Sequence, residues 1–236
     1  MSQTITLLDD DNIAFPAVER ALVEPNGLLA IGGDLSVKRL INAYKSGIFP
    51  WYSENEPLMW WSPNPRAIIP VEHIRINRTL RKFLNKNLYQ VTVNKAFNQV
   101  VALCADAPFR RESTWILPEM QYAYQQLHQL GVAHSIEVWC KDELVGGLYG
   151  VAINGFFSGE SMFYSQPNGS KVALVYLAHL MKQHGIEFID CQMLNPFLED
   201  MGAVEISREK FIKIKEQAIN KIIAEDFWQP RTLSLA

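Results

Sequence analysis

Three polar residues lie at the ends of two segments that are otherwise mainly apolar. Glu160 lies near the end of residues 156–163, and Asp190 and Gln192 lie at the end of the short segment that begins at Ile186. Side chains two apart on a strand point to the same face, so Asp190 and Gln192 are expected side by side, with Glu160 near them if the strands are neighbours. A desolvated carboxylate is costly unless it is paired or hydrogen-bonded. The pattern therefore indicates a pocket that binds a cation or holds a proton, unless these carboxylates lie at the solvent boundary.

The spacing of the remaining polar residues indicates neither a metal site nor a catalytic nucleophile. Cys104, Cys140 and Cys191 are widely spaced, and the five histidines include no pair with zinc-ligand spacing, so we expect no metal. No histidine is placed by the sequence against a serine or cysteine nucleophile. Asn195 directly precedes Pro196, a position typical of a turn residue.

Composition is that of a globular protein of 236 residues and 26.9 kDa, with 48% hydrophobic residues and a mean hydropathy of −0.04. No apolar segment approaches the length that spans a bilayer. The first residues lead into Asp9, Asp10 and Asp11, not into a basic and then apolar leader, so we expect a cytoplasmic protein.

Charge is distributed unevenly along the chain. Residues 66–111 hold nine Lys or Arg against Glu72 and Asp106, a balance of +7, so the other residues carry −10 within a net charge of −3. A local basic field on an acidic body suits contact with phosphates, and Arg78, Arg81 and Lys82 are the candidates for a nucleic-acid backbone. The alternative is a solvated helical face.

Aromatic residues gather in a proline-rich segment. Trp51, Trp60 and Trp61 lie between Pro50 and Pro65, whose intervening prolines exclude a continuous helix. Large flat side chains on irregular backbone suit stacking on bases or closure over an apolar substrate. The alternative is an aromatic cluster that buries the crossing between two lobes.

Hydrophobic periodicity predicts an α+β fold. Strand patterns at 135–140, 144–151 and 156–163 form a meander with an Asn154-Gly155 hairpin, followed by a helix at 171–184, a strand at 186–191 and a helix after Ser207. This is the order of the acyltransferase core of amine N-acetyltransferases. A smaller N-terminal domain, residues 1–65, is expected to precede a C-terminal domain of residues 66–236.

Several motifs in collinear order resemble the bacterial leucyl/phenylalanyl-tRNA–protein transferases. The resemblance runs from about Phe15 to Arg231. The motifs are residues 24–35 (EPNGLLAIGGDL), 47–51 (GIFPW), 60–66 (WWSPNPR), 114–116 (TWI), 133–139 (AHSIEVW), 146–150 (GGLYG), 159–163 (GESMF) and 189–192 (IDCQ).

The resemblance implies transfer of Leu or Phe, and less readily Met, from aminoacyl-tRNA to the α-amino group of proteins that begin with Arg or Lys. Such transfer marks the acceptor for degradation by the N-end rule. It also implies a small N-terminal domain and a C-terminal domain similar to the N-acetyltransferase core. Aminoacyl-tRNA and the acceptor protein are the partners, no cofactor is needed, and we expect a monomer.

The resemblance also assigns roles to individual residues. Trp51 and Trp115 match the pair that holds the terminal adenine, and Glu160, Asp190 and Asn195 match the face that receives the N-terminal Arg or Lys. Asp190 and Gln192 are the expected catalytic residues. The pocket for the aminoacyl side chain matches residues that periodicity alone would place in the core: Leu148, Phe157, Met162, Leu174, Leu177 and Met181.

The chemistry fits these residues. An aminoacyl ester is already activated and the attacking amine must be neutral, so positioning and the removal of one proton suffice. Asp190 takes that proton directly or through Gln192, which itself is not a base, and the ribose hydroxyl of the tRNA is a further acceptor. The sequence leaves these routes open.

Two other functions compete with aminoacyl transfer. A CoA-dependent N-acetyltransferase needs a small residue in its pyrophosphate loop where residues 166–171 (QPNGSK) place Lys171. A non-catalytic RNA-binding module would use the basic segment and the tryptophans, but it gives Glu160, Asp190 and Gln192 no role.

Overall fold

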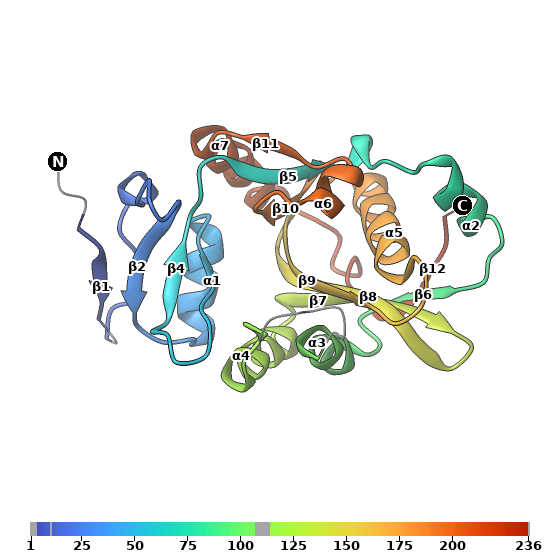
Figure 1. Ribbon diagram of the computed structural model, residues 1–236, viewed down its shortest axis with the longest axis horizontal. Helices are drawn as coiled ribbons and strands as arrows, with labels where there is room; N and C mark the ends of the chain where they lie inside the picture. Colours follow the sequence, from blue (N-terminus) through green and yellow to red (C-terminus); the bar gives the residue numbers. More distant parts are fainter. Residues whose placement is uncertain (1–3, 10, 107–113, 236) are drawn as a thin grey trace.

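A computed structural model describes residues 4–9, 11–106 and 114–235 as two β-sheets with helices packed around them (Figure 1). The smaller sheet has the strand order β1-β2-β4-β3, with β1 parallel to β2 and the other pairs antiparallel. Its elements are β1 (Thr6–Leu8), β2 (Leu28–Gly32), β3 (Phe49–Pro50) and β4 (Met59–Trp61), with the helix α1 (Val37–Lys45) and the short 3-10 helix η1 (Val18–Arg20).

The larger sheet has eight strands in the order β11-β5-β10-β9-β8-β7-β6-β12. Only β9 and β10 pair in parallel; every other neighbouring pair among these strands is antiparallel. The strands are β5 (Arg66–Pro70), β6 (Gln90–Val93), β7 (Ala133–Cys140), β8 (Glu143–Ile153), β9 (Phe156–Tyr164), β10 (Phe188–Gln192), β11 (Val204–Ile206) and β12 (Arg231–Leu233).

Helices cover both faces of the larger sheet. Figure 1 shows α3 and α4 on one face and α5 on the other, while α7 packs beside β5 and β10. From β6 to β10 the elements follow the order strand, two helices, three strands, helix and strand, as in the N-acetyltransferase core. The predicted α+β fold is confirmed. The helical elements are η2 (Val71–His73), α2 (Arg78–Leu84), α3 (Phe97–Ala105), α4 (Pro118–Gln129), α5 (Gly169–Gln183), α6 (Pro196–Asp200) and α7 (Arg208–Ile219).

Local signals explain where several elements begin and end. The hairpin between β8 and β9 turns at Asn154, whose φ of 51° lies in the left-handed region that Asn tolerates. The side chain of Ser207 accepts a hydrogen bond from the Lys210 amide and caps α7. The helix predicted at 171–184 begins two residues earlier, at Gly169, after Asn168, which has a φ of 65°.

Most of the aromatic segment belongs to the smaller sheet, in β3 and β4. Trp60 and Trp61 lie in β4, both buried, and the indole of Trp60 donates to the carbonyl of Gly32 at 2.9 Å. Trp51, which follows β3, keeps 38% of its surface exposed. The two tryptophans within β4 are therefore part of the core, whereas Trp51, outside the strands, is accessible. The segment 62–65 connects the smaller sheet to the larger one.

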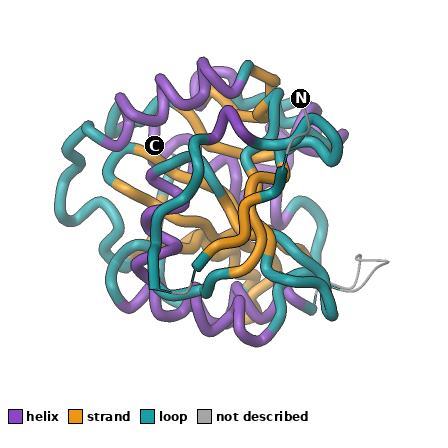
Figure 2. The backbone as a smooth tube through the Cα atoms, turned by 90° about the vertical axis from the view of Figure 1, so that its left-hand side faces the viewer, coloured by secondary structure: helices purple, strands orange, loops and turns teal. Residues whose placement is uncertain are grey.

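One apolar core joins the two sheets. Figure 2, in which the smaller sheet faces the viewer, shows its strands in front of those of the larger sheet. The buried cluster between them includes Leu40 of α1, Phe97 of α3 and Phe211 of α7. The smaller sheet and α1 are therefore packed against the part of the larger sheet that carries the polar residues singled out above.

Candidate active site

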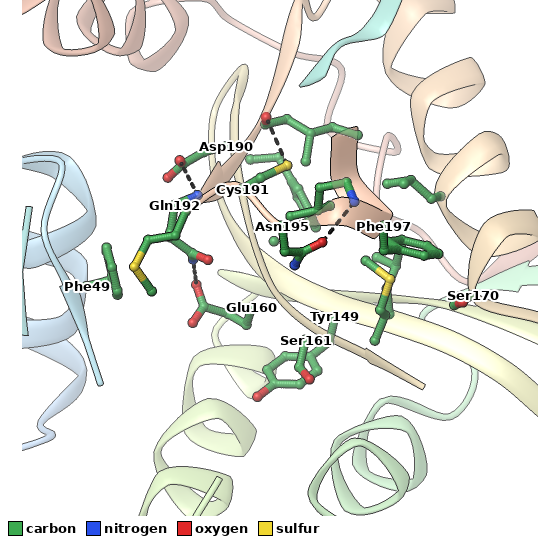
Figure 3. Close-up of a pocket in the computed structure, with 18 of the residues that line it drawn as sticks. Phe49, Tyr149, Glu160, Ser161, Ser170, Asp190, Cys191, Gln192, Asn195 and Phe197 are labelled. Atoms are coloured by element: carbon green, nitrogen blue, oxygen red, sulfur yellow. Dashed lines mark hydrogen bonds between the residues drawn. The ribbon is translucent and has the colours of Figure 1, made fainter. Parts of the chain in front are cut away.

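A cavity of about 700 Å³ opens between the smaller sheet, the larger sheet and α5. It forms where the parallel strands β9 and β10 part. The two strands pair only through Ile189 with Phe157 and Asp190 with Ser158, after which β9 runs on toward Tyr164. Figure 3 shows Glu160 and Gln192 facing each other across this opening.

Asp190 forms a buried ion pair with Arg66. Its Oδ1 accepts from Nε of Arg66 at 2.8 Å, and its Oδ2 accepts from Nη2 at 2.7 Å. Asp190 has no exposed surface and Arg66 is 1% exposed. A bidentate guanidinium and carboxylate is the geometry in which a buried pair is best compensated, so the charge of Asp190 is already neutralised within the protein.

Ser158 and Gln192 extend this pair toward Glu160. The hydroxyl of Ser158 donates to Oδ2 of Asp190 at 3.0 Å, and the backbone N–H of Gln192 donates to Oδ1 at 3.1 Å. The side-chain Nε2 of Gln192 lies 3.2 Å from both Oγ of Ser158 and Oε1 of Glu160. The predicted proximity of Glu160, Asp190 and Gln192 is therefore present as a connected hydrogen-bond network.

A break in strand pairing makes this network possible. The register between β10 and β5 shifts between Asp190 and Gln192, and Gln192 has a φ of 59°, in the left-handed region. Strain of this kind persists only where the surroundings hold it, which they do here through the bonds made by Gln192. The intervening Cys191 has a thiol whose pKa burial raises well above its usual value, so it is unsuited to act as a thiolate nucleophile.

Both carboxylates of the network line the cavity, but Asp190 is fully buried whereas Glu160 keeps part of its surface exposed. Its Oε2 accepts from the phenol of Tyr124 at 2.6 Å, and the phenol of Tyr44 lies 2.7 Å from that of Tyr124. Burial raises the pKa of Glu160 from 4.5 to about 7; the hydrogen bonds from Tyr124 and Tyr44 oppose the rise and the charge of Asp190 adds to it. Glu160 is thus poised to gain or lose a proton near neutral pH.

The opposite wall of the cavity is apolar. Five of the predicted pocket residues line it, and all of them come from β8, β9 and α5: Leu148, Phe157, Met162, Leu174 and Leu177. Met181 is placed differently: it is fully buried one turn further along α5, in the core, and is not among the described residues that line the cavity. Ile189 and Phe197 complete the wall.

Trp51 and Trp115 both line the same cavity. Trp61 supports Trp51, because its indole donates to the Trp51 carbonyl at 2.7 Å and the two rings meet edge to face at 5.6 Å. Trp115 is partly buried. The structure thus brings together the two tryptophans that the sequence analysis paired, although 64 residues separate them in the chain.

Comparisons with known proteins identify the family of this chain. A family model described as leucyl/phenylalanyl-tRNA protein transferase matches residues 68–216, and a model described as the N-terminal domain of the same protein matches residues 33–64. This chain belongs to that transferase family. Relatives with the same name come from Colwellia psychrerythraea, 64% identical over 100% of both chains, and Idiomarina loihiensis, 49% identical over 98% of both.

Solved structures are more distant from this transferase. The structure of L-PGS from Bacillus licheniformis has a TM-score of 0.40 and 12% identity, and covers 86% of this chain. The chain spans 65% of the length of that protein.

Asn195 lies beside the network at the start of α6. Its Oδ1 accepts from the Leu198 amide at 2.9 Å, which leaves the amide nitrogen turned away from the helix, as Figure 3 shows. Asn195 is exposed and lines the cavity. The turn role and the binding role that the sequence left open are therefore compatible, since different atoms of the side chain serve each.

The basic segment divides into parts with different surroundings. Arg78, Arg81 and Lys82 are exposed on α2, at the end of the molecule opposite the smaller sheet (Figure 1). Arg66 is buried in the ion pair with Asp190, so its charge does not contribute to the basic surface predicted for residues 66–111. Arg110 and Arg111 lie outside the described residues.

Sequence reasoning missed several residues of the transferase site. Arg66 opens a strand that continues with Ala67 and two isoleucines, and a single Arg before such an apolar strand was the available signal. Ser158 shares the β9 face with Glu160 by its spacing of two residues. Nothing in the local sequence of Tyr44 or Tyr124 indicates their bonds toward Glu160, because both have the spacing of core residues in helices.

Metal-ligand clusters and membrane spans are absent from the described part of the transferase. No group of three or more His, Cys, Asp or Glu residues there is arranged to hold a metal ion. No helix in residues 4–9, 11–106 and 114–235 has the length and apolar character needed to cross a membrane.

Proposed function

We propose that this protein transfers Leu or Phe, and less readily Met, from aminoacyl-tRNA to the α-amino group of proteins that begin with Arg or Lys. The product is marked for degradation by the N-end rule, in the cytoplasm. One observation carries the proposal beyond family membership: a single cavity is lined by an apolar wall, by two tryptophans and by the carboxylates of the polar network. We also propose that residues 1–65 and 66–236 are its two domains, since β4 and β5 belong to different sheets.

The aminoacyl-tRNA end occupies the tryptophans and the apolar wall. The terminal adenine stacks between Trp51 and Trp115, a contact that tolerates any base but needs exposed ring faces. The Leu or Phe side chain enters the space beside Leu148, Phe157, Met162, Leu174 and Leu177, where it leaves water. The ester carbonyl then lies between this wall and the polar network.

The acceptor cation is received by Glu160 and Asn195. Asp190 is fully buried and its charge is balanced by Arg66, which argues against direct contact with a substrate Arg or Lys. Glu160 also lines the cavity and keeps part of its surface exposed, and a cation that leaves water needs such a partner. The role of Asp190 in our proposal is therefore exerted through Gln192.

Transfer requires one new bond and the movement of one proton. The neutral α-amine attacks the ester carbonyl, the C–N bond forms, and the C–O bond to the ribose breaks. Gln192 holds the amine in place, Glu160, whose pKa is about 7, takes the amine proton, and the departing ribose oxygen finally receives a proton. The amine has a pKa of about 8, close enough for exchange with Glu160.

A substrate comparison tests this function. The protein is incubated with labelled leucyl-tRNA, labelled acetyl-CoA or deacylated tRNA, each with peptides that begin with Arg, Lys or Ala. We expect leucine on the Arg and Lys peptides and no acetyl transfer. Acetylation of any peptide would support the CoA-dependent alternative, and tRNA binding without transfer would support the RNA-binding alternative.

A further inference from the structure

Arg66 lies between the smaller sheet and the polar network. Its guanidinium carbon is 4.9 Å from the ring centroid of Phe49 and 4.4 Å from that of Phe211, so two aromatic faces enclose it. Nη1 donates to the carbonyl of Gly47 at 3.3 Å, while Nε and Nη2 donate to Asp190. Arg66 is not among the described residues that line the cavity, so it has no route to direct contact with substrate.

The bonds of Arg66 determine which way the neighbouring protons point. A guanidinium only donates, so both oxygens of Asp190 are acceptors, and a carboxylate has no proton to give. Ser158 must then donate its single proton to Asp190, at 3.0 Å; its other carboxylate neighbour, Oε1 of Glu160, is more distant at 3.4 Å. The oxygen of Ser158 is left as an acceptor.

The orientation of the Gln192 amide follows from this. Since Oγ of Ser158 and Oε1 of Glu160 both accept, the group that faces them at 3.2 Å must be the NH₂ of Gln192. The amide oxygen of Gln192 then points to the remaining side, and no described residue donates to it. Gln192 lines the cavity, so this oxygen is available to an N–H of the attacking amine.

We propose that Arg66 is a positioning residue for aminoacyl transfer. By holding Asp190 as an acceptor on both oxygens, it sets the direction of the Ser158 and Gln192 hydrogen bonds and presents the Gln192 oxygen to the amine. The inference rests on the proposed function. It adds that the N-terminal part of the chain contributes to catalysis, because Phe49 of β3 and Gly47 of the turn before it contact the guanidinium.

The direct test replaces Arg66 by Met, which fits between the two rings without donors or charge. We expect kcat for leucine transfer to an Arg-initiated peptide to fall about 10- to 100-fold, as for other partners that orient a reacting group. The KM for leucyl-tRNA should stay within about twofold, because Arg66 touches no substrate. Arg66→Lys keeps the charge but has no planar fork, so its kcat should lie between those of the parent and Arg66→Met.

Arg208→Met is the matched control. Arg208 is partly buried, whereas Arg66 is fully buried, and its Nη1 donates to the carbonyl of Val18 at 2.8 Å; it makes no described bond to Asp190. Its kcat should equal that of the parent. Thermal unfolding of both Met variants measures how much stability each loses. If the two lose similar stability and only Arg66→Met loses kcat, the effect on kcat is not a consequence of a less stable fold.

A double variant decides whether Arg66 acts through Asp190. In Asp190→Asn the Arg66 fork has no carboxylate partner, so adding Arg66→Met should lower kcat by no more than about threefold further. Losses that multiply in the double variant, or a rise in the KM for leucyl-tRNA, would overturn the proposal. If the parent protein itself moved no leucine to the Arg peptide, the proposed function would fail instead, before any variant is compared.

Discussion

Tyr124 donates to Glu160 across 2.6 Å and links this carboxylate to α1 through Tyr44. Burial raises the pKa of both phenols well above 10.0, so both keep their protons. When Glu160 is ionised, Tyr124 must donate to it and Tyr44 must donate to Tyr124, which stabilises the charged form of a buried acid. The two tyrosines therefore limit how far burial raises the pKa of Glu160.

Replacing Tyr124 by Phe removes a bond that lowers the pKa of Glu160. That pKa should rise above its parental value of about 7, so more of the enzyme is protonated at neutral pH and unable to accept the amine proton. We expect the acid limb of the pH dependence of kcat/KM to move to higher pH. Rates with one Arg peptide are measured from about pH 5.5 to about pH 9, so the titration of the amine is common to all variants.

Tyr176→Phe serves as the control for this experiment. Tyr176 lies on α5, is half-buried, and is not among the described residues that line the cavity. Its pH profile should match that of the parent. An unshifted acid limb in Tyr124→Phe would mean that the substrate amine, and not Glu160, defines the profile.

Glu160 should also make stability depend on pH. Its folded-state pKa of about 7 lies above the ordinary value of 4.5, so between these pH values the folded state binds a proton that the unfolded state has released. The contribution of Glu160 to the free energy of unfolding therefore decreases as pH rises through this window. Gln does not titrate, so Glu160→Gln lacks this pH-dependent contribution. Its free energy of unfolding relative to the parent should therefore increase from about pH 5 to about pH 8, by on the order of 1–2 kcal/mol.

Urea unfolding of both proteins at several pH values in this range measures the difference. Unfolding free energies that differ by a constant amount at every pH would show that Glu160 titrates normally. In that case its proposed role as proton acceptor near neutral pH would lose its physical basis.

Local patterns were sufficient for much of the fold and for part of the site. The hairpin at Asn154, the cap at Ser207 and the meander strands depend on neighbouring residues, and the structure contains them. Glu160 and Gln192 were found because polar side chains in apolar strands are costly without a purpose. These signals depend only on residues that are neighbours in the chain, so they can be recognised in a single sequence.

Distant pairings could not be predicted in the same way. Arg66 and Asp190 are 124 residues apart, and a charge count treats Arg66 like any surface cation. Whether a charge is buried depends on β5 pairing with β10, and neither strand specifies its partner by itself. The same holds for Met181, whose helical spacing matches that of the cavity residues Leu174 and Leu177 although it lies deeper in the core.

The apolar wall should determine the preference between Leu and Phe. Leu174→Phe adds volume to a residue that lines the cavity, so it should reduce phenylalanine transfer more than leucine transfer. A difference of about 10-fold or more in the ratio of kcat/KM is expected, since crowding a pocket by a few carbon atoms costs about 1–3 kcal/mol. Competition between leucyl-tRNA and phenylalanyl-tRNA measures this ratio.

Met181→Leu provides the control, because it conserves volume at the core position beneath the wall. The ratio of leucine to phenylalanine transfer should remain parental in this variant. A changed ratio in Met181→Leu, with none in Leu174→Phe, would place the side-chain pocket deeper along α5 than the cavity extends in this structure.

The exposed cations of α2 should bind the tRNA backbone without reading its sequence. Arg78, Arg81 and Lys82 lie on one short helix at the end of the molecule opposite the smaller sheet, away from the tryptophans that we propose to hold the adenine. Each cation that binds a phosphate releases a condensed counterion. Replacing all three by Gln should raise the KM for leucyl-tRNA and reduce the slope of log K against log salt by roughly 0.7–0.9 for each phosphate that the variant no longer binds.

The control removes charge from another helix. Lys210 and Lys213 are exposed on α7, and their replacement by Gln should leave the salt slope almost unchanged. Equal slopes for the parent and the α2 variant would instead identify these cations as a solvated helix face and would move the path of the tRNA to another surface.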